Sequence, residues 1–254
     1  MFTQLMAGAP AAAPVVYAFP HAGAGAAAMM PLAEAATDRF SLRCIALPGR
    51  LERLSEPVRT RFQPLAEDIG DALAADLAGR DDSPYALLGS CGGAYLVLEA
   101  ARVLRRMMVR PPAAVLVASA AAPDVAPVPH RIGTLPSQAL WDYLLAHDGV
   151  PAELYTDPAF RTLTEPALRA DFQLFADYRH LARPPLDTDL VVLHGELDDG
   201  LRLGELLGWR RQSSRPLRMV TVPKTGRWLL ERDPAPVADL IFDLLNNGEF
   251  GSAR

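Results

Sequence analysis

Cysteine is scarce in this sequence: Cys44 and Cys91 are the only two among 254 residues. Two cysteines cannot form a disulfide framework, so the sequence predicts a protein of a reducing compartment, the cytoplasm. An excess of positive charge is also lacking, because 25 Lys and Arg residues stand against 30 Asp and Glu residues, a net charge of −5. A mildly acidic chain is a poor partner for nucleic acid, which excludes that class of function.

Long apolar runs are lacking as well. Residues 1–14 contain no basic segment ahead of an apolar run, as a secretory signal would. Residues 14–33 carry no Asp, Glu, Lys or Arg, but they are rich in alanine and are interrupted by Pro20 and Pro31. Such a segment is too weakly hydrophobic and too broken to span a bilayer, so we expect no membrane association.

Half of the residues are hydrophobic and 22 % are charged, which is the composition of a globular protein. Short apolar runs, typical of buried strands, alternate with segments of helical period. The predicted strands are Val15–Phe19, Leu42–Leu47, Tyr85–Leu88, Ala113–Ser119, Leu190–His194 and Leu217–Val222. The predicted helices between and after them are Pro64–Leu77, Gly92–Arg106 and Asp233–Asn246. This alternation predicts one α/β domain over residues 1–254, with a mostly parallel sheet covered by helices on both faces.

One stretch, from about residue 134 to residue 180, contains no predicted strand. Apolar residues at helical spacing, among them Leu140, Leu144, Leu168 and Phe172, indicate two or three amphipathic helices there. Because these helices interrupt the alternation of strands and helices, we predict a helical insertion above the sheet edge that acts as a lid over a substrate channel. Helices that only extend the core are the alternative.

The most informative segment is YALLGSCGGAY, which begins at residue 85. A short strand enters the string GSCGG and a helix follows, which is the G-x-nucleophile-x-G elbow with Cys91 at the nucleophile position. The turn is tight enough to need its glycines, and it holds the central residue at a helix N-terminus, where an anion is favoured. We therefore expect Cys91 to be a nucleophile with a lowered pKa. A buried structural cysteine in a Gly-rich turn is the alternative.

Acyl transfer at such an elbow also needs amide donors that stabilise an oxyanion. The string FPHAGAG follows the first predicted strand, and its glycines let backbone N–H groups turn toward the site. We predict Ala22 as one oxyanion donor and Gly92, the residue after the nucleophile, as the other. His21 is expected to shape this loop and to contact substrate, with a role as a base as the alternative.

Several strings and single residues along the chain are distinctive: FPHAG from residue 19, LPGRLERLSEP from residue 47, the elbow, Glu99, Asp171 and the pair Tyr178-Arg179. Together they resemble the type II thioesterases, stand-alone α/β-hydrolase-fold enzymes of polyketide and non-ribosomal peptide pathways, from about residue 15 to residue 245. The resemblance implies an α/β-hydrolase fold with a helical lid, a monomer, and neither cofactor nor metal. It also implies a substrate that arrives as a thioester on the phosphopantetheine arm of an acyl or peptidyl carrier protein.

The chain departs from that family at two catalytic positions. Family members carry serine in the elbow, where this chain has Cys91. The acidic member of the triad matches Asp198 in the string GELDD, with Asp199 or a pair of surface acids as alternatives. The catalytic histidine is expected in a Gly-His-aromatic string, which here reads GRW. Arg227 thus occupies the histidine position, and the aromatic Trp228 is expected to contact substrate.

These two departures are chemically compatible with each other. A serine needs a base, whereas a cysteine of lowered pKa does not, and a permanently cationic Arg227 beside Cys91 favours the thiolate. Pairing of Arg227 with Asp198 is the alternative. Because this loop has no histidine to activate water, we expect acyl transfer, or cyclisation and release, through a Cys91 acyl-enzyme. An editing thioesterase with a base from elsewhere, such as His21 or a lid histidine, and a catalytically inactive scaffold are the alternatives.

Overall fold

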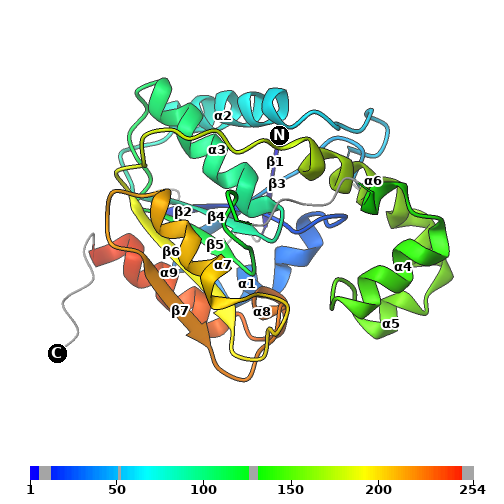
Figure 1. Cartoon of the computed structure of the whole chain (residues 1–254). Coiled ribbons are helices and arrows are strands. Elements are labelled where there is room, and N and C mark those ends of the chain that lie inside the picture. The colour runs from blue at the N-terminus through cyan, green and yellow to red at the C-terminus, as the bar shows by residue number, and fades with distance from the viewer. Residues whose placement is uncertain (6–12, 51–52, 126–130, 248–254) are drawn as a thin grey trace.

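A seven-stranded sheet forms the centre of the molecule in the computed structural model, which describes residues 1–5, 13–50, 53–125 and 131–247 (Figure 1). The strand order is β1-β3-β2-β4-β5-β6-β7; β1 is antiparallel to β3 and all other neighbours are parallel. The strands are β1 Phe2–Leu5, β2 Val15–Phe19, β3 Ser41–Ile45, β4 Tyr85–Ser90, β5 Ala114–Ala118, β6 Asp189–Gly195 and β7 Arg218–Val222. The mostly parallel sheet confirms the predicted fold class.

The helices lie on both faces of this sheet and beyond one of its edges. Those of the core are η1 Ala26–Met29, α1 Met30–Ala36, α2 Phe62–Ala78, α3 Gly93–Arg106, α7 Leu203–Leu207, η4 Gly208–Arg211, α8 Leu229–Arg232 and α9 Ala235–Asn247. Those between β5 and β6 are η3 Ile132–Thr134, α4 Ser137–Ala146, α5 Ala152–Tyr155 and α6 Pro158–Asp177. Among the helices of the described ranges, none is both long and apolar enough to cross a membrane.

Alternate residues of the strands belong to two separate hydrophobic cores. In β2, Val15, Tyr17 and Phe19 pack in one core, under α2 and α3, while Val16 and Ala18 pack in the other, against α1 and α9. Figure 1 shows these two helical layers on opposite sides of the sheet. Because both faces are covered, the central strands β2, β4 and β5 are buried along their whole length and consist mostly of apolar residues. These strands are therefore predictable from the sequence.

The six predicted strands and the three predicted helices are confirmed, with boundaries shifted by up to a few residues. β1 is not predicted, because four residues at a sheet edge carry little periodicity. It joins the sheet by pairing antiparallel with β3, from Phe2 opposite Ile45 to Leu5 opposite Leu42.

Residues 132–177, called the helical insertion below, form helices and no strand, as the sequence predicts. Its longest helix, α6, begins where the Asp157 carboxylate accepts hydrogen bonds from the amides of Ala159 and Phe160, at 2.9 and 3.1 Å. In Figure 1, α4 and α5 lie to one side of the sheet and α6 leads back to the core. α6 thereby brings its inner face over the carboxyl ends of the central strands, where the candidate site lies.

Candidate active site

Cys91 lies in the turn between β4 and α3, with a φ of +51°. This left-handed conformation is unfavourable for a residue with a side chain and is typical of strained functional turns. The glycines around it are required by close approach: a Cβ on Gly89 would lie 2.5 Å from the Gly93 carbonyl oxygen, and one on Gly93 would lie 2.4 Å from that of Phe19. The chain therefore forms the strand–turn–helix elbow that the sequence predicts.

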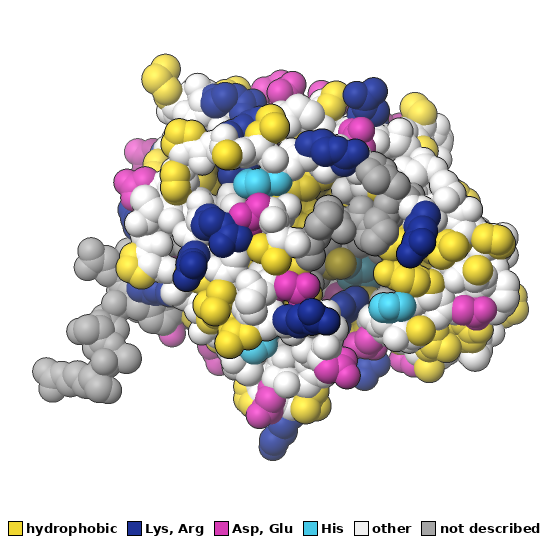
Figure 2. Space-filling model, in the orientation of Figure 1, with side chains coloured by type: hydrophobic (Ala, Val, Ile, Leu, Met, Phe, Trp, Pro, Cys, Tyr) yellow, Lys and Arg dark blue, Asp and Glu magenta, His cyan; other side chains and the backbone are white. Residues whose placement is uncertain are grey.

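A pocket of about 210 Å³ opens above Cys91. Its walls are largely apolar and come from the helical insertion, namely from Leu144, Leu168, Phe172 and Phe175. In the space-filling view the surface is hollowed beside the insertion, and arginine and histidine side chains border this hollow (Figure 2). The insertion thus supplies much of the wall of a pocket that ends at the cysteine, which is the arrangement expected of a lid.

The two predicted oxyanion donors, Ala22 and Gly92, both line this pocket. Among the hydrogen bonds of the described residues, neither of their amides donates to a protein oxygen. The loop of Ala22 is held from the next residue, because the Gly23 amide donates to the Asp171 carboxylate of α6 at 2.7 Å, and Arg50 forms a buried ion pair with the same carboxylate. Two amides beside a cysteine that donate to no protein oxygen are what an oxyanion hole requires.

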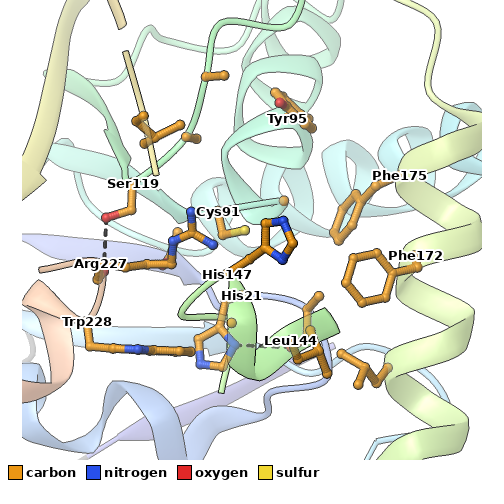
Figure 3. A pocket seen from close by; sticks show the side chains of 18 of the residues that line it. His21, Cys91, Tyr95, Ser119, Leu144, His147, Phe172, Phe175, Arg227 and Trp228 are labelled. Atoms are coloured by element: carbon orange, nitrogen blue, oxygen red, sulfur yellow. Dashed lines mark hydrogen bonds between the residues drawn. The ribbon is translucent and has the colours of Figure 1, made fainter. Parts of the chain in front are cut away.

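Arg227 also lines the pocket, and Figure 3 shows its guanidinium directed toward Cys91. Its backbone is fixed by Ser119, whose hydroxyl donates to the Arg227 carbonyl oxygen at 2.9 Å. Within the described part of the chain, the guanidinium forms no hydrogen bond and no ion pair, and its Nε is buried. An unpartnered cation in a largely apolar pocket is available to an anion formed during the reaction.

Asp198, the predicted acid, lies in the turn after β6. Its Oδ1 accepts a hydrogen bond from the Gly200 amide at 3.1 Å, while its Oδ2 is buried without a partner. Asp198 and the Arg227 guanidinium are neighbours across Gly200, yet none of their charged atoms come within 4.0 Å. Asp199 is exposed. The buried, unused oxygen of Asp198 points to a place for a hydrogen-bond donor that Arg227 does not occupy.

The expectation of a lowered pKa for Cys91 is wrong. Burial raises the pKa of the Cys91 thiol, and the carboxylates of Asp198 and Glu231 add to this rise. The Arg227 guanidinium and the Gly92 amide act in the opposite direction, as predicted, but they do not outweigh burial. The site therefore favours the protonated form of Cys91, and use of this thiol as a nucleophile requires a group that takes the proton.

Both ring nitrogens of His21 lie near oxygen atoms. Nδ1 lies 3.1 Å from the Ala22 carbonyl oxygen, Nε2 lies 3.6 Å from Oε1 of Glu231, and the ring packs edge-on against Trp228 at 4.8 Å. Burial lowers the pKa of His21 and raises the pKa of Glu231 to about 7. These contacts support the loop-shaping role over that of a base. His21 and Trp228 both line the pocket, where the prediction that they contact substrate places them.

His147 is a pocket residue that the sequence did not single out. It follows α4 in the helical insertion; its Nδ1 lies 2.8 Å from the Tyr143 carbonyl oxygen, and its ring stacks on that of Tyr143 at 4.1 Å. Figure 3 shows the imidazole projecting into the pocket beside Cys91. The available signal was a histidine in the predicted insertion, but His130 and His180 gave much the same signal.

No group of three or more His, Cys, Asp or Glu side chains within the described ranges is placed to hold a metal ion. Neither Cys44 nor Cys91 forms a disulfide. The chemistry of the pocket therefore depends on Cys91, the amides of Ala22 and Gly92, Arg227 and the neighbouring imidazoles.

Comparison with known proteins identifies the family. The model of the thioesterase domain matches residues 14–245. The chain is 34 % identical to the AMB antimetabolite synthetase AmbE of Pseudomonas aeruginosa, in an alignment that covers 68 % of this chain but only 8 % of AmbE. It is 26 % identical to the gramicidin S biosynthesis protein GrsT of Aneurinibacillus migulanus, and that alignment covers 85 % of this chain and 83 % of GrsT. The structure of the type II thioesterase BorB from the borrelidin biosynthetic cluster superposes with a TM-score of 0.85 at 27 % identity, over 96 % of this chain and 97 % of BorB. Because the family match covers nearly the whole sequence, this protein is a member of the thioesterase domain family of hydrolase-fold enzymes.

Proposed function

We propose that this protein acts on acyl or peptidyl thioesters that a carrier protein presents on its phosphopantetheine arm, in polyketide or non-ribosomal peptide biosynthesis. The observation that carries the proposal is Cys91 on a strained elbow at the end of an apolar pocket. The names of the relatives support it, because GrsT and BorB are tied to gramicidin S and to borrelidin biosynthesis. Two free cysteines fit the reducing cytoplasm in which such pathways operate.

In the first half of the reaction, the Cys91 sulfur loses its proton and attacks the thioester carbonyl carbon. The developing oxyanion accepts hydrogen bonds from the amides of Ala22 and Gly92, and the charge of Arg227 favours the anionic states of the site. The carbon–sulfur bond to pantetheine then breaks, and the departing thiolate takes a proton. The product is an acyl group on Cys91 and a free pantetheine thiol on the carrier.

In the second half, we propose that an acceptor thiol, amine or carbon nucleophile takes the acyl group, by transfer or by cyclisation and release. Two observations favour this over hydrolysis. The residue at the expected place of the catalytic histidine is Arg227, which cannot act as a base at neutral pH. The apolar walls formed by Leu144, Leu168, Phe172 and Phe175 also disfavour water beside the acyl-enzyme.

Hydrolysis, as in an editing thioesterase, is the second candidate. The observation in its favour is the imidazole of His147, which lines the same pocket as Cys91 and lies at its exposed side. A base there can serve water as well as an acceptor. Whether water or another acceptor reacts depends on which of them reaches the acyl carbon on Cys91.

The test is intact-mass measurement after mixing the protein with acetyl- or hexanoyl-pantetheine, followed by product analysis with and without an added thiol acceptor. We expect an acyl adduct on native protein and on Cys44→Ala, and none on Cys91→Ala, whose alanine fits the elbow without disturbing the fold. Transfer to the acceptor supports the first candidate, and turnover to free acid supports the second. No adduct and no turnover in folded native protein would refute both and leave an inactive scaffold.

A further inference from the structure

The pocket contains a thiol that must lose a proton and few groups that can take it. Besides the thiol itself, its titratable lining side chains are His21, Tyr95, Tyr143, His147 and Arg227. Burial raises the pKa of Tyr95 well above its ordinary value, and Arg227 is a permanent cation. In His21, Nδ1 lies 3.1 Å from the Ala22 carbonyl oxygen, Nε2 lies on the side of Glu231 at 3.6 Å, and burial lowers the pKa, which makes this imidazole a weaker base. Tyr143 offers a hydroxyl and no basic nitrogen, so the imidazole of His147 is the remaining lining group with a nitrogen that can take a proton.

The contacts of His147 define which nitrogen is free. A carbonyl oxygen only accepts hydrogen bonds, so Nδ1 must donate its proton to the Tyr143 carbonyl oxygen at 2.8 Å. In the neutral ring Nε2 then carries a lone pair, and the ring is oriented by its stacking on Tyr143. This is the same tautomer and the same kind of backbone anchor that general-base histidines use, although this histidine comes from the helical insertion and not from the sheet.

A second contact fixes the turn that carries His147. The indole N–H of Trp228 donates to Oδ1 of the adjacent Asp148 at 3.3 Å. Trp228 directly follows Arg227, so this hydrogen bond joins the turn of His147 to the loop from which the expected histidine is missing. Asp148 has a φ of +47° and Gly149 donates its amide back to the Leu144 carbonyl oxygen at 2.7 Å, which closes α4 at this point. The insertion is thereby attached at the place where it delivers an imidazole.

We propose that His147 is the proton-transfer residue of this site, a base that the helical insertion supplies in place of the one absent from the loop after β7. The inference rests on the proposed Cys91 acyl-enzyme. In acylation, Nε2 of His147 takes the Cys91 thiol proton as the sulfur attacks, and the imidazolium returns it to the departing pantetheine sulfur. In deacylation, Nε2 takes a proton from water or the acceptor as it attacks the acyl carbon, and the Cys91 sulfur receives that proton when the bond to it breaks.

The experiment measures the formation and the loss of the Cys91 adduct separately, by rapid-quench intact mass with hexanoyl-pantetheine. General-base catalysis is worth roughly 10²–10⁴-fold, so we expect His147→Gln to slow both phases by at least about 10²-fold. His180→Gln, a histidine outside the pocket, is the matched control and should resemble native protein. Circular dichroism melts verify that each variant is folded.

Chemical rescue separates proton transfer from a structural role. Added imidazole should restore part of the rate to His147→Ala, because His147 lies at the exposed side of the pocket, and should not restore Cys91→Ala. If native protein forms and loses the adduct but His147→Gln does so at the same rate, the His147 assignment is overturned while the proposed function stands. If native protein forms no adduct at all, the proposed function fails and the assignment fails with it.

The hydrogen bond between Trp228 and Asp148, which joins the turn of His147 to the loop after β7, can be tested with two variants. Trp228→Phe keeps an aromatic ring but removes the indole donor, and should lower both rates by about 10-fold, because misplaced catalytic groups lose much of their effect. Asp148→Asn keeps an acceptor oxygen and tolerates a positive φ, so it should remain close to native. Equal rates in Trp228→Phe and native protein would refute the role of this hydrogen bond.

Discussion

The two sides of the pocket differ in how closely they follow the expected catalytic arrangement. On the side of β4, α3 and the loop after β2, the elbow and its glycines are formed, and Ala22 and Gly92, the predicted oxyanion donors, line the pocket with Cys91. On the side of β6 and β7, Asp198 is in its expected turn with a buried oxygen unused, but the neighbouring loop offers Arg227 in place of an imidazole.

This difference shows which parts of such a site can be exchanged. The elbow leaves no room for a side chain at Gly89 or Gly93, because a Cβ added at either position would lie less than 3 Å from backbone atoms. A base needs only to reach the reacting atoms with a suitable lone pair, so any element that borders the pocket can carry it. In the arrangement that we propose, the helical insertion brings His147 as the base, while Arg227 adds positive charge in the loop where the family resemblance predicts a histidine.

The largest loss of activity on the side of the elbow is expected for Gly92→Ala. A Cβ at this position would lie 2.2 Å from Cε2 of Phe175, which is 4 % exposed and lines the pocket. The Phe175 ring must then move into the pocket, or α6 must shift away from the elbow, so we expect at least about a 10²-fold loss of thioester consumption in steady-state assays. Gly204→Ala in α7 is the control, because its Cβ would meet nothing within 4 Å. If Gly92→Ala keeps native activity, the packing of α6 on the elbow is not needed for catalysis.

Placing a histidine at position 227 tests whether the unpartnered Oδ2 of Asp198 can orient an imidazole. In Arg227→His the imidazole would have Oδ2 of Asp198 as its hydrogen-bond acceptor, and we expect hydrolysis of hexanoyl-pantetheine to rise by about 10-fold to 10²-fold. The gain stays below the full effect of a base because Trp228 and the insertion are not shaped around this histidine. Arg227→Gln, which removes the charge without adding a base, is the control.

The same substitution can be combined with others. Arg227→His should also rescue His147→Gln, since it supplies a second source of proton transfer, and together with Cys91→Ser it completes a Ser-His-Asp set. Transfer to an added acceptor should fall as hydrolysis rises, because water then competes for the acyl group. Unchanged hydrolysis in every combination would mean that Asp198 is not positioned to orient an imidazole.

The smallest expected effect concerns the charge of Arg227 alone. Burial raises the pKa of Cys91 and Arg227 opposes that rise, so removal of the guanidinium should raise the pKa further. The rate of iodoacetamide alkylation should have its midpoint above the ~8.5 of a free thiol in native protein, and higher still in Arg227→Ala. Arg210→Ala, an exposed arginine outside the pocket, should leave the midpoint unchanged. A midpoint below 8.5 in native protein would contradict the effect of burial.

The central part of the fold could be predicted because its signals are local. The central strands β2, β4 and β5 are short apolar runs buried on both faces, and α2 repeats Leu65, Ile69 and Leu73 on one buried face. β1, by contrast, forms by pairing with β3, and its four residues at the sheet edge carry no local pattern that predicts this pairing. The helical insertion was visible as helices, but its position over Cys91 depends on contacts such as that of Gly23 with Asp171.

The sequence by itself determined the elbow, the oxyanion loop and the presence of Arg227 where a histidine is expected, because steric limits and short motifs act within a few residues. Only the tertiary structure decided the direction of the Cys91 pKa, since burial, Arg227, Asp198 and Glu231 contribute from separate elements. It also decided that His147 reaches the pocket. Electrostatics and proton transfer depend on distances through space, and these are set by how α4, α6 and the loop after β7 pack together.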